Sequence, residues 1–424
     1  MVVRLSPFPE ELDRGYHGRL MRFNGYSDEG DFIRYAAKSC KLPMSLPREA
    51  VPIVVLSTLA GKTTEEFVRF HTLLPFRRAI TNIRPEVAFG SLSSPSMLRT
   101  GTTRARQKHI FFCSECALED VEFHGVSYWR RDHQITGQVW CPKHRVALSF
   151  VTKQSDVLKS PYSFRTQAVR VDKNLVDEAM RNDAVNRFLD IASGLAHRKK
   201  SLPGVAAAIE IRREAEMRGL FTYGKKDLRG VMSEFIRSSY PANWLARIMP
   251  ELVDKAPETT LAPIDSVLNL IKRRWPSTSY LLIAAAIYKL SDEATTKLMN
   301  CEDKFSDKPL PIPIDKLIEE YAQAYGRYPS IAQSLKMSHA DTARILGKAR
   351  LPNLSQRRPT KNLFAAAYSL CFEGLTLADC SKQINASAKE LSTWDIRPNS
   401  PLMRALRLMY PESAQKECLS EAVI

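Results

Sequence analysis

The segment that decides the fold runs from Phe112 to Phe150 and reads FCSECALEDVEFHGVSYWRRDHQITGQVWCPKHRVALSF. Cys113 and Cys116 form a C-x2-C pair, and Cys141 and His144 form a C-x2-H pair further along the chain. Two such pairs supply the four nitrogen and sulfur ligands of a tetrahedral zinc ion when the chain folds back on itself. Three reduced cysteines and a histidine in an ordinary core are the alternative, but the paired spacing favours zinc.

A site with these ligands is expected to be structural. Three cysteines and one histidine fill a tetrahedral shell, so no coordination position stays open for a substrate and the metal holds the shape of the chain. Tyr128 and Trp129 are expected to cap a site that is too small for a core of its own, and Gly137 to make a turn. The nearby His109, His124 and His133 are predicted to be core residues or spare ligands rather than catalytic bases.

The same segment resembles a known family. It contains the run W-(x3)-H-Q-(x2)-G-(x3)-C-(x2)-H, made by Trp129, His133, Gln134, Gly137, Cys141 and His144. This run is similar to one in the TniQ/TnsD family of transposon target-selection proteins. Ser114, Ile135–Thr136 and Ala147–Leu148 stand where the family typically has Pro, Leu-Pro and Pro-Leu, and none of them is a predicted ligand.

The resemblance extends over about residues 7–290 and is strongest at 112–148. Pro7 through Asn24–Gly25 resembles the start of TniQ proteins. Tyr280 stands where TnsD-type members usually have His, which leaves the subgroup open. The resemblance implies a non-catalytic protein that selects a transposition target and contacts the transposon's regulatory AAA+ ATPase, which is TnsC-like.

The overall charge indicates a polyanionic partner. The 424 residues include 62 Lys and Arg against 46 Asp and Glu, a formal net charge of +16. Such an excess is typical of proteins that bind nucleic acid, although a merely basic protein would also show it. The cysteines outside the zinc pairs are scattered and show no disulfide framework, which fits a reducing compartment. The longest apolar run, Tyr280–Tyr288, is too short for a membrane helix, so we expect a cytoplasmic, nucleoid-associated bacterial protein with no membrane partner.

Hydrophobic periodicity predicts a mainly α, multidomain protein with a small Cys3His zinc-finger module in its N-terminal half and helix-turn-helix-like bundles in its C-terminal half. Leu202-Pro203-Gly204 is interpreted as the linker between the halves. Five parts are expected: a helical TniQ-like region (1–100), the zinc-finger module (101–150), a helical connector (151–203), a TnsD-like helical region (204–310) and a tandem helix-turn-helix-like region (311–424).

The last part carries two similar patterns. The first predicts helices over 314–325, 330–336 and 338–348, with Ile331, Leu335, Ala343 and Leu346 as the apolar spine. The second predicts helices over 363–372, 376–383 and 387–394. In such units the third helix enters the major groove of DNA. Structural or protein-binding three-helix bundles remain the alternative.

Basic residues in two regions are candidates for contacts with nucleic acid. The Ser-, Thr- and Arg-rich segment 90–108 is either a phosphate-binding loop or a solvated one. In the last part, His339, Thr342, Arg344, Lys348 and Arg350 are expected to face outward. The predicted nucleic-acid-binding residues are Arg104, Arg106, Lys108, His339, Arg344, Lys348, Arg350, Arg357, Arg358, Lys361 and Lys389.

Three functions fit these patterns. Scattered acids, and no phosphate-binding or dinucleotide-binding glycine motif, argue against an enzyme. The first function is a target selector that binds double-stranded DNA directly and recruits the ATPase and transposase. The second is an adaptor, usually a homodimer, that joins an RNA-guided CRISPR complex of the Cascade type to the transposition machinery. The third is a zinc-containing transcription regulator. Neighbouring genes would discriminate among them.

Overall fold

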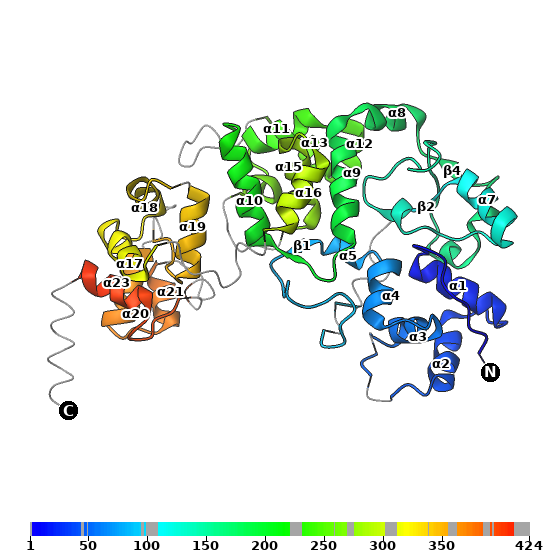
Figure 1. The fold of residues 1–424 in the computed structure, drawn as a ribbon, viewed down its shortest axis with the longest axis horizontal. Helices are drawn as coiled ribbons and strands as arrows, with labels where there is room; N and C mark the ends of the chain where they lie inside the picture. Colours follow the sequence, from blue (N-terminus) through cyan, green and yellow to red (C-terminus); the bar gives the residue numbers. More distant parts are fainter. Residues whose placement is uncertain are drawn as a thin grey trace. The chain divides into compact units, whose positions relative to one another are not determined.

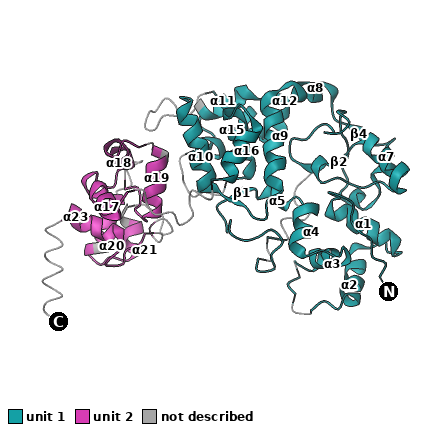
Figure 2. Ribbon diagram, viewed as in Figure 1, with its two compact units in different colours: residues 1–221, 225–302 teal, residues 222–224, 303–424 magenta. Residues whose placement is uncertain are grey.

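The computed structural model describes residues 2–43, 46–48, 50–94, 97–98, 109–220, 231–257, 259–268, 275–301, 312–337, 339–354, 363–384, 391 and 394–410. Over these ranges the chain is mainly helical, as predicted. It divides into two compact units (Figure 2): residues 1–221 with 225–302 form unit 1, and residues 222–224 with 303–424 form unit 2. Among the described residues, no helix combines the length and the apolar character needed to cross a membrane.

Unit 1 begins with short helices that pack on one another (Figure 1). The helix α4 shows why they form where they do: Thr63 accepts a hydrogen bond from the Glu66 amide and the Glu66 carboxylate accepts one from the Thr63 amide, a capping box that satisfies the first free amides. The helices of this region are α1 (Asp13–Phe23), α2 (Glu29–Ser39), α3 (Val51–Leu59), α4 (Thr64–His71) and α5 (Leu74–Arg77).

A three-stranded antiparallel sheet and one helix build the region around the predicted metal ligands. Strand β2 (Ile110–Phe112) pairs with β3 (Ser149–Val151), and β3 pairs with β4 (Val169–Arg170). Helix α7 (Ser114–His124) follows β2 directly and ends at Gly125. Three short 3-10 helices complete the region: η1 (Asp132–Gln134), η2 (Gln154–Leu158) and η3 (Pro161–Phe164).

The second half of unit 1 is a helical layer around one central helix, α15. That helix is apolar on all sides and almost wholly buried, which is the behaviour expected of a core helix. Helices α9, α10 and α16 pack against it. The helices of this layer are α8 (Lys173–Arg181), α9 (Asp183–Ala196), α10 (Gly204–Met217), α11 (Val231–Ser239), α12 (Ala242–Ile248), α13 (Pro250–Val253), α14 (Ala262–Asp265), α15 (Ser277–Ile287) and α16 (Ser291–Met299).

The predicted linker at Leu202–Gly204 is wrong. Leu202–Pro203 form strand β5, which pairs in parallel with β1 (Ile80–Thr81), and Gly204 is the first residue of α10. Leu202 is fully buried. Pro and Gly therefore serve here to end one element and start the next inside unit 1, and the change of unit falls near residue 302 instead. The five-part division of the chain stays a prediction.

Unit 2 follows the predicted helical pattern closely. The first pattern becomes α17 (Ile314–Gln323), α18 (Tyr328–Ser334) and α19 (His339–Lys348). The second becomes α20 (Leu363–Phe372) and α21 (Leu377–Ile384), while most of its third predicted helix lies outside the described residues. A further helix, α23 (Pro401–Met409), packs against both α17 and α20. Residues of both patterns thereby share a single hydrophobic core.

The predicted apolar spine of α19 is displaced by one residue. Thr342 and Ile345 are fully buried beside Leu346, whereas Ala343 is half-buried. Thr342 therefore faces the core, and its predicted outward orientation is wrong. The buried face of a helix takes in about two residues on each turn. The residues on either side of a predicted core position therefore fit the sequence pattern equally well. Only the element that packs against the helix decides which of them is buried.

Candidate metal centre

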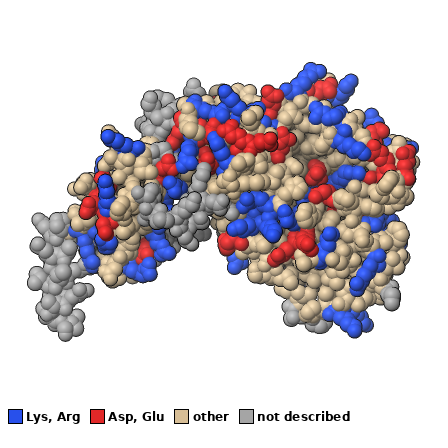
Figure 3. Space-filling view, in the orientation of Figure 1, with Lys and Arg blue, Asp and Glu red and all other residues tan. Residues whose placement is uncertain are grey.

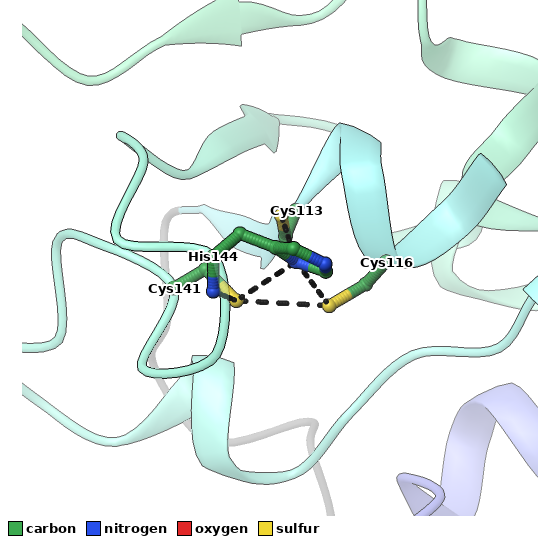
Figure 4. Close-up of side chains that lie close together, drawn as sticks. All are labelled: Cys113, Cys116, Cys141 and His144. Atoms are coloured by element: carbon green, nitrogen blue, oxygen red, sulfur yellow. Dashed lines mark hydrogen bonds between the residues drawn. The ribbon is translucent and has the colours of Figure 1, made fainter. Parts of the chain in front are cut away.

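The four predicted ligands come together at the junction of β2, α7 and the turn before β3 (Figure 4). Cys113 precedes α7 and Cys116 lies in its first turn, so one helix start presents both thiols. Cys141 and His144 come from the second pair, where the His144 amide donates to Cys141 Sγ over 3.5 Å. The four ligand atoms lie within 4.8 Å of one another.

The separations match a tetrahedral shell. Cys116 Sγ lies 3.6 Å from Cys141 Sγ, and His144 Nδ1 lies 3.5 Å from Cys113 Sγ, 3.3 Å from Cys116 Sγ and 3.7 Å from Cys141 Sγ. Ligands bound at about 2.3 Å from a central ion would be separated by roughly 3.7 Å, as geometry requires of a tetrahedron. The site is therefore positioned to bind one metal ion, and the arrangement is compatible with zinc.

The electrostatics of the sulfurs favour a cation at this position. Hydrogen bonds with Cys113 and Cys141 raise the pKa of the Cys116 thiol, while contacts with Cys113 and Cys116 lower the pKa of Cys141. The thiol with the raised pKa therefore keeps its proton while its neighbour loses one, because thiolates this close repel each other. Three thiolates are stable together only when a positive ion lies among them.

Glu119 on α7 supports the histidine ligand and was not predicted. His144 Nε2 lies 2.9 Å from Glu119 Oε1, and Lys143 donates to the other carboxylate oxygen. These hydrogen bonds, from Lys143 first and His144 second, lower the pKa of Glu119. A carboxylate on the outer nitrogen fixes the ring so that Nδ1 faces the sulfurs. The sequence signal was the position of Glu119, three residues after Cys116 on the same helix.

The remaining motif residues hold the module in place. Gln134 accepts from the Phe111 amide over 3.0 Å and donates to the Phe111 carbonyl over 2.6 Å, which fixes the edge of β2. His133 is buried against the Cys141 sulfur, and Trp129 is 1% exposed in an apolar cluster with Phe112. His133 therefore fills the core-residue role that the sequence suggested.

Gly137 connects the module to a helix that lies far along the chain. It has a φ of +93°, and its carbonyl accepts a 2.8 Å hydrogen bond from the indole nitrogen of Trp244 on α12. An added Cβ would lie 2.8 Å from the Trp244 ring and 2.9 Å from Ile248. Glycine is needed here both for its conformation and for the close approach. Nothing in the sequence pointed to Trp244 as the partner.

The comparisons with known proteins agree with this arrangement. Residues 2–148 match the family model described as TniQ. No curated protein matches the chain. The matched region ends at Leu148, four residues after the last metal ligand, and it takes in the short N-terminal helices as well as the complete ligand set. Residues 2–148 thus form a mainly helical TniQ domain that contains a Cys3His group positioned to bind a metal ion, and a TniQ domain implies a transposition-associated protein.

The predicted nucleic-acid-binding residues are only partly placed. Those that lie outside the described residues are Arg104, Arg106, Lys108, Arg357, Arg358, Lys361 and Lys389. On α19, His339 and Lys348 are half-buried. The Arg344 side chain is 18% exposed and lies 3.5 Å from Asp341, whereas Arg350 is 68% exposed and lies 3.3 Å from Asp395. The assignment of these residues to nucleic acid stays a prediction.

Proposed function

We propose that this chain is a non-catalytic target-selection protein of a transposon. It binds double-stranded target DNA and recruits the transposon's AAA+ ATPase and, through it, the transposase. The observation that carries the proposal is the TniQ domain at residues 2–148 with its complete Cys3His ligand set, joined in one chain to the separate helical unit 2. The bound ion is zinc, because three thiolates and one imidazole in a tetrahedron suit that metal.

Unit 2 is the proposed DNA reader. The helices α17, α18 and α19 follow one another with short connections, and such an arrangement places its third helix in the major groove. Lys348 is the last residue of α19, Arg350 lies in the turn that follows, and the basic residues Arg357 and Arg358 come later in the sequence. Lys and Arg at such positions neutralise phosphates or read guanine edges.

The direct test is selection from a random duplex DNA library with the full-length, zinc-loaded protein at two salt concentrations. A site reader enriches one sequence, and the enrichment is lost with Arg344→Ala or Lys389→Ala. Arg404→Ala, which removes a basic side chain 46% exposed and paired with Asp315, serves as the control and should keep it. Salt-sensitive binding with no enriched sequence would reject direct reading.

A second function, the adaptor of an RNA-guided complex, is favoured by one observation. The two helical patterns of unit 2 share a single core, so they form one body rather than two independent readers. An adaptor leaves sequence choice to the guide and needs only a docking body. Copurification of guide RNA with the protein and its neighbouring gene products would support this function. A transcription regulator is the least supported of the three, because the TniQ domain belongs to transposition-associated proteins.

A further inference from the structure

Two exposed arginines of unit 2 share one carboxylate. Arg350 Nη1 lies 3.3 Å from Asp395 Oδ2, and Arg397 Nη2 lies 2.6 Å from the same oxygen. Arg397 Nε also donates to Asp395 Oδ1 over 2.8 Å. The two arginine side chains are 68% and 76% exposed, whereas the Asp395 side chain is only 8% exposed. We call Arg350 and Arg397 the arginine pair.

The turn after α19 fixes the position of Arg350. The Arg350 amide donates to the Gly347 carbonyl over 3.2 Å, and the Leu351 amide donates to the Leu346 carbonyl over 2.9 Å. Arg350 has a φ of +56°, at the place after a helix where glycine is usual. The next residue, Leu351, is 1% exposed in the shared core of unit 2. Non-glycine residues held in this conformation occur often at ligand-binding sites.

The segment before α23 fixes the other two side chains. Trp394 packs against the core of unit 2. Ser400 caps α23 by accepting from the Met403 amide, and its hydroxyl donates to the Asp395 carbonyl over 2.7 Å. The Ser400 amide donates to the Arg397 carbonyl over 2.8 Å. One core therefore anchors both segments, and side chains that are already ordered lose less entropy when they meet a ligand.

The charges of this group do not cancel. Two guanidiniums face one carboxylate, and hydrogen bonds, above all from Arg397, hold the pKa of the Asp395 carboxyl well below its usual range. Within the described ranges, neither member of the arginine pair forms an ion pair with another acidic side chain, so one net positive charge remains. Arg404 and Asp315, by contrast, form a neutral pair of one with one. Figure 3 shows Lys and Arg side chains next to Asp and Glu side chains on the visible face of unit 2.

A phosphodiester is the ligand that this arrangement fits. A guanidinium is planar and carries several N–H donors, of which Asp395 takes up only a part. The remaining donors suit the oxygens of a phosphate, and one net positive charge matches the single charge of a phosphodiester. Arg350 lies just past the end of α19, and in the homeodomain form of the helix-turn-helix the end of the third helix contacts the DNA backbone.

We propose that the arginine pair, joined by Asp395, clamps one phosphate in the backbone of the target DNA. The proposal rests on the proposed function of unit 2 as a DNA reader. It deepens that function, because it gives Arg397 and Asp395 a part in the contact that the helical pattern alone does not suggest. The clamp holds a phosphate and reads no base, so it positions the protein on DNA without selecting a sequence.

The main test compares Arg397→Gln with Arg404→Gln in the full-length, zinc-loaded protein. Both remove one exposed arginine from unit 2, but Arg397→Gln leaves a neutral Arg350–Asp395 pair. Affinity for a labelled duplex DNA and for a duplex RNA of equal length is measured by fluorescence anisotropy over a salt series. Arg397→Gln should lower the slope of log affinity against log salt by about 0.9 and the affinity in ~0.1 M salt about tenfold. Arg404→Gln should leave both values unchanged.

Two further variants test how the group works. Arg350→Gln combined with Arg397→Gln should lower the slope by about 0.9 and not by about 1.8, because both side chains hold a single phosphate. Asp395→Asn keeps an oxygen acceptor for the Arg397 amide but removes the charge that offsets one guanidinium, so it should steepen the slope by about 0.9. A double variant near 1.8, or an Asp395→Asn slope that does not steepen, would overturn the clamp.

The outcomes separate the clamp from the proposed function. Equal slopes for Arg397→Gln and Arg404→Gln, with wild-type binding to DNA intact, overturn the clamp and leave the proposed function standing. A loss seen with RNA alone overturns target DNA as the ligand. Failure of the wild-type protein to bind either duplex, which is seen before any substitution, overturns the proposed function as well. Thermal unfolding curves that match the wild type confirm that the variants are folded.

Discussion

The Cys3His region and unit 2 reach stable folds by different means. In unit 2, apolar side chains from α17, α19, α20 and α23 meet in one core, and the hydrophobic effect stabilises it. Around the metal centre, three strands of two or three residues and one helix bury few apolar side chains of their own. In the Cys3His region, the ligand set and contacts from distant segments supply the stability that a hydrophobic core provides in unit 2. The difference predicts that metal loss and core damage act on separate parts of the molecule.

The largest effect is expected from losing a ligand. Cys116→Ser removes a thiolate from the shell, and structural zinc sites of this type contribute on the order of 10 kcal/mol in isolated modules. We expect the variant to lose its metal and unit 1 to unfold at a lower temperature, while unit 2 unfolds as before. Elemental analysis and thermal unfolding measure both. Cys40→Ser, at a half-buried cysteine outside the ligand set, is the control. A variant that keeps one ion per chain would contradict a Cys3His shell.

Damage to the core of unit 2 should be smaller and should leave the metal in place. Leu346 is fully buried, and Leu346→Ala creates a cavity that costs about 2–5 kcal/mol of unfolding free energy. Leu408→Ala, at a side chain 56% exposed on α23, should change stability by less than about 0.5 kcal/mol. Denaturant unfolding with parallel metal analysis tests the pair. Metal release caused by Leu346→Ala would show that the two regions are not independent.

A matched pair of glycines tests how the metal region is attached to the later helices. Gly137 and Gly125 both have positive φ, +93° and +74°, but an added Cβ meets Trp244 and Ile248 only at Gly137. Gly125→Ala should cost about 1 kcal/mol from its conformation alone. Gly137→Ala should lower the free energy of unfolding by about 2–4 kcal/mol, since overpacking against Trp244 and Ile248 adds to the same conformational strain. Tryptophan fluorescence during unfolding reports both. Equal losses of unfolding free energy in the two variants would mean that α12 moves to make room for the added methyl group.

The smallest effect is expected outside the ligand shell. Glu119→Gln weakens the hydrogen bond to His144 Nε2 and removes a negative charge near the ion, so metal affinity should fall about 10- to 100-fold. Glu115→Gln makes the same change at an exposed position of α7 whose side chain forms no hydrogen bond or ion pair with the described residues, and it should leave the affinity unchanged. Competition with a chromophoric chelator measures both variants. An equal loss in both would indicate a general effect of charge on α7 and not a specific contact.

Much of the fold followed from local sequence patterns. The helices of unit 2 begin and end close to their predicted residues, because capping residues and apolar spacing act within a few positions of each helix. The ligand set followed from paired spacing for the same reason. Leu202–Gly204 misled the prediction because proline and glycine end elements both inside and between compact units, and only the strand partner at Ile80–Thr81 distinguishes the two cases.

The sequence by itself determined the Cys3His set that is positioned for a metal ion, the helical class, the excess of positive charge and the TniQ domain, since each of these depends on residue types and short spacings. Only the tertiary structure decided that Trp244 packs on Gly137, that Glu119 supports His144 and that one core joins both patterns of unit 2. It also decided that Arg69 on α4 donates to the His197 carbonyl after α9. These pairings join residues far apart in the chain, and their energies come from packing and burial, which no local pattern encodes.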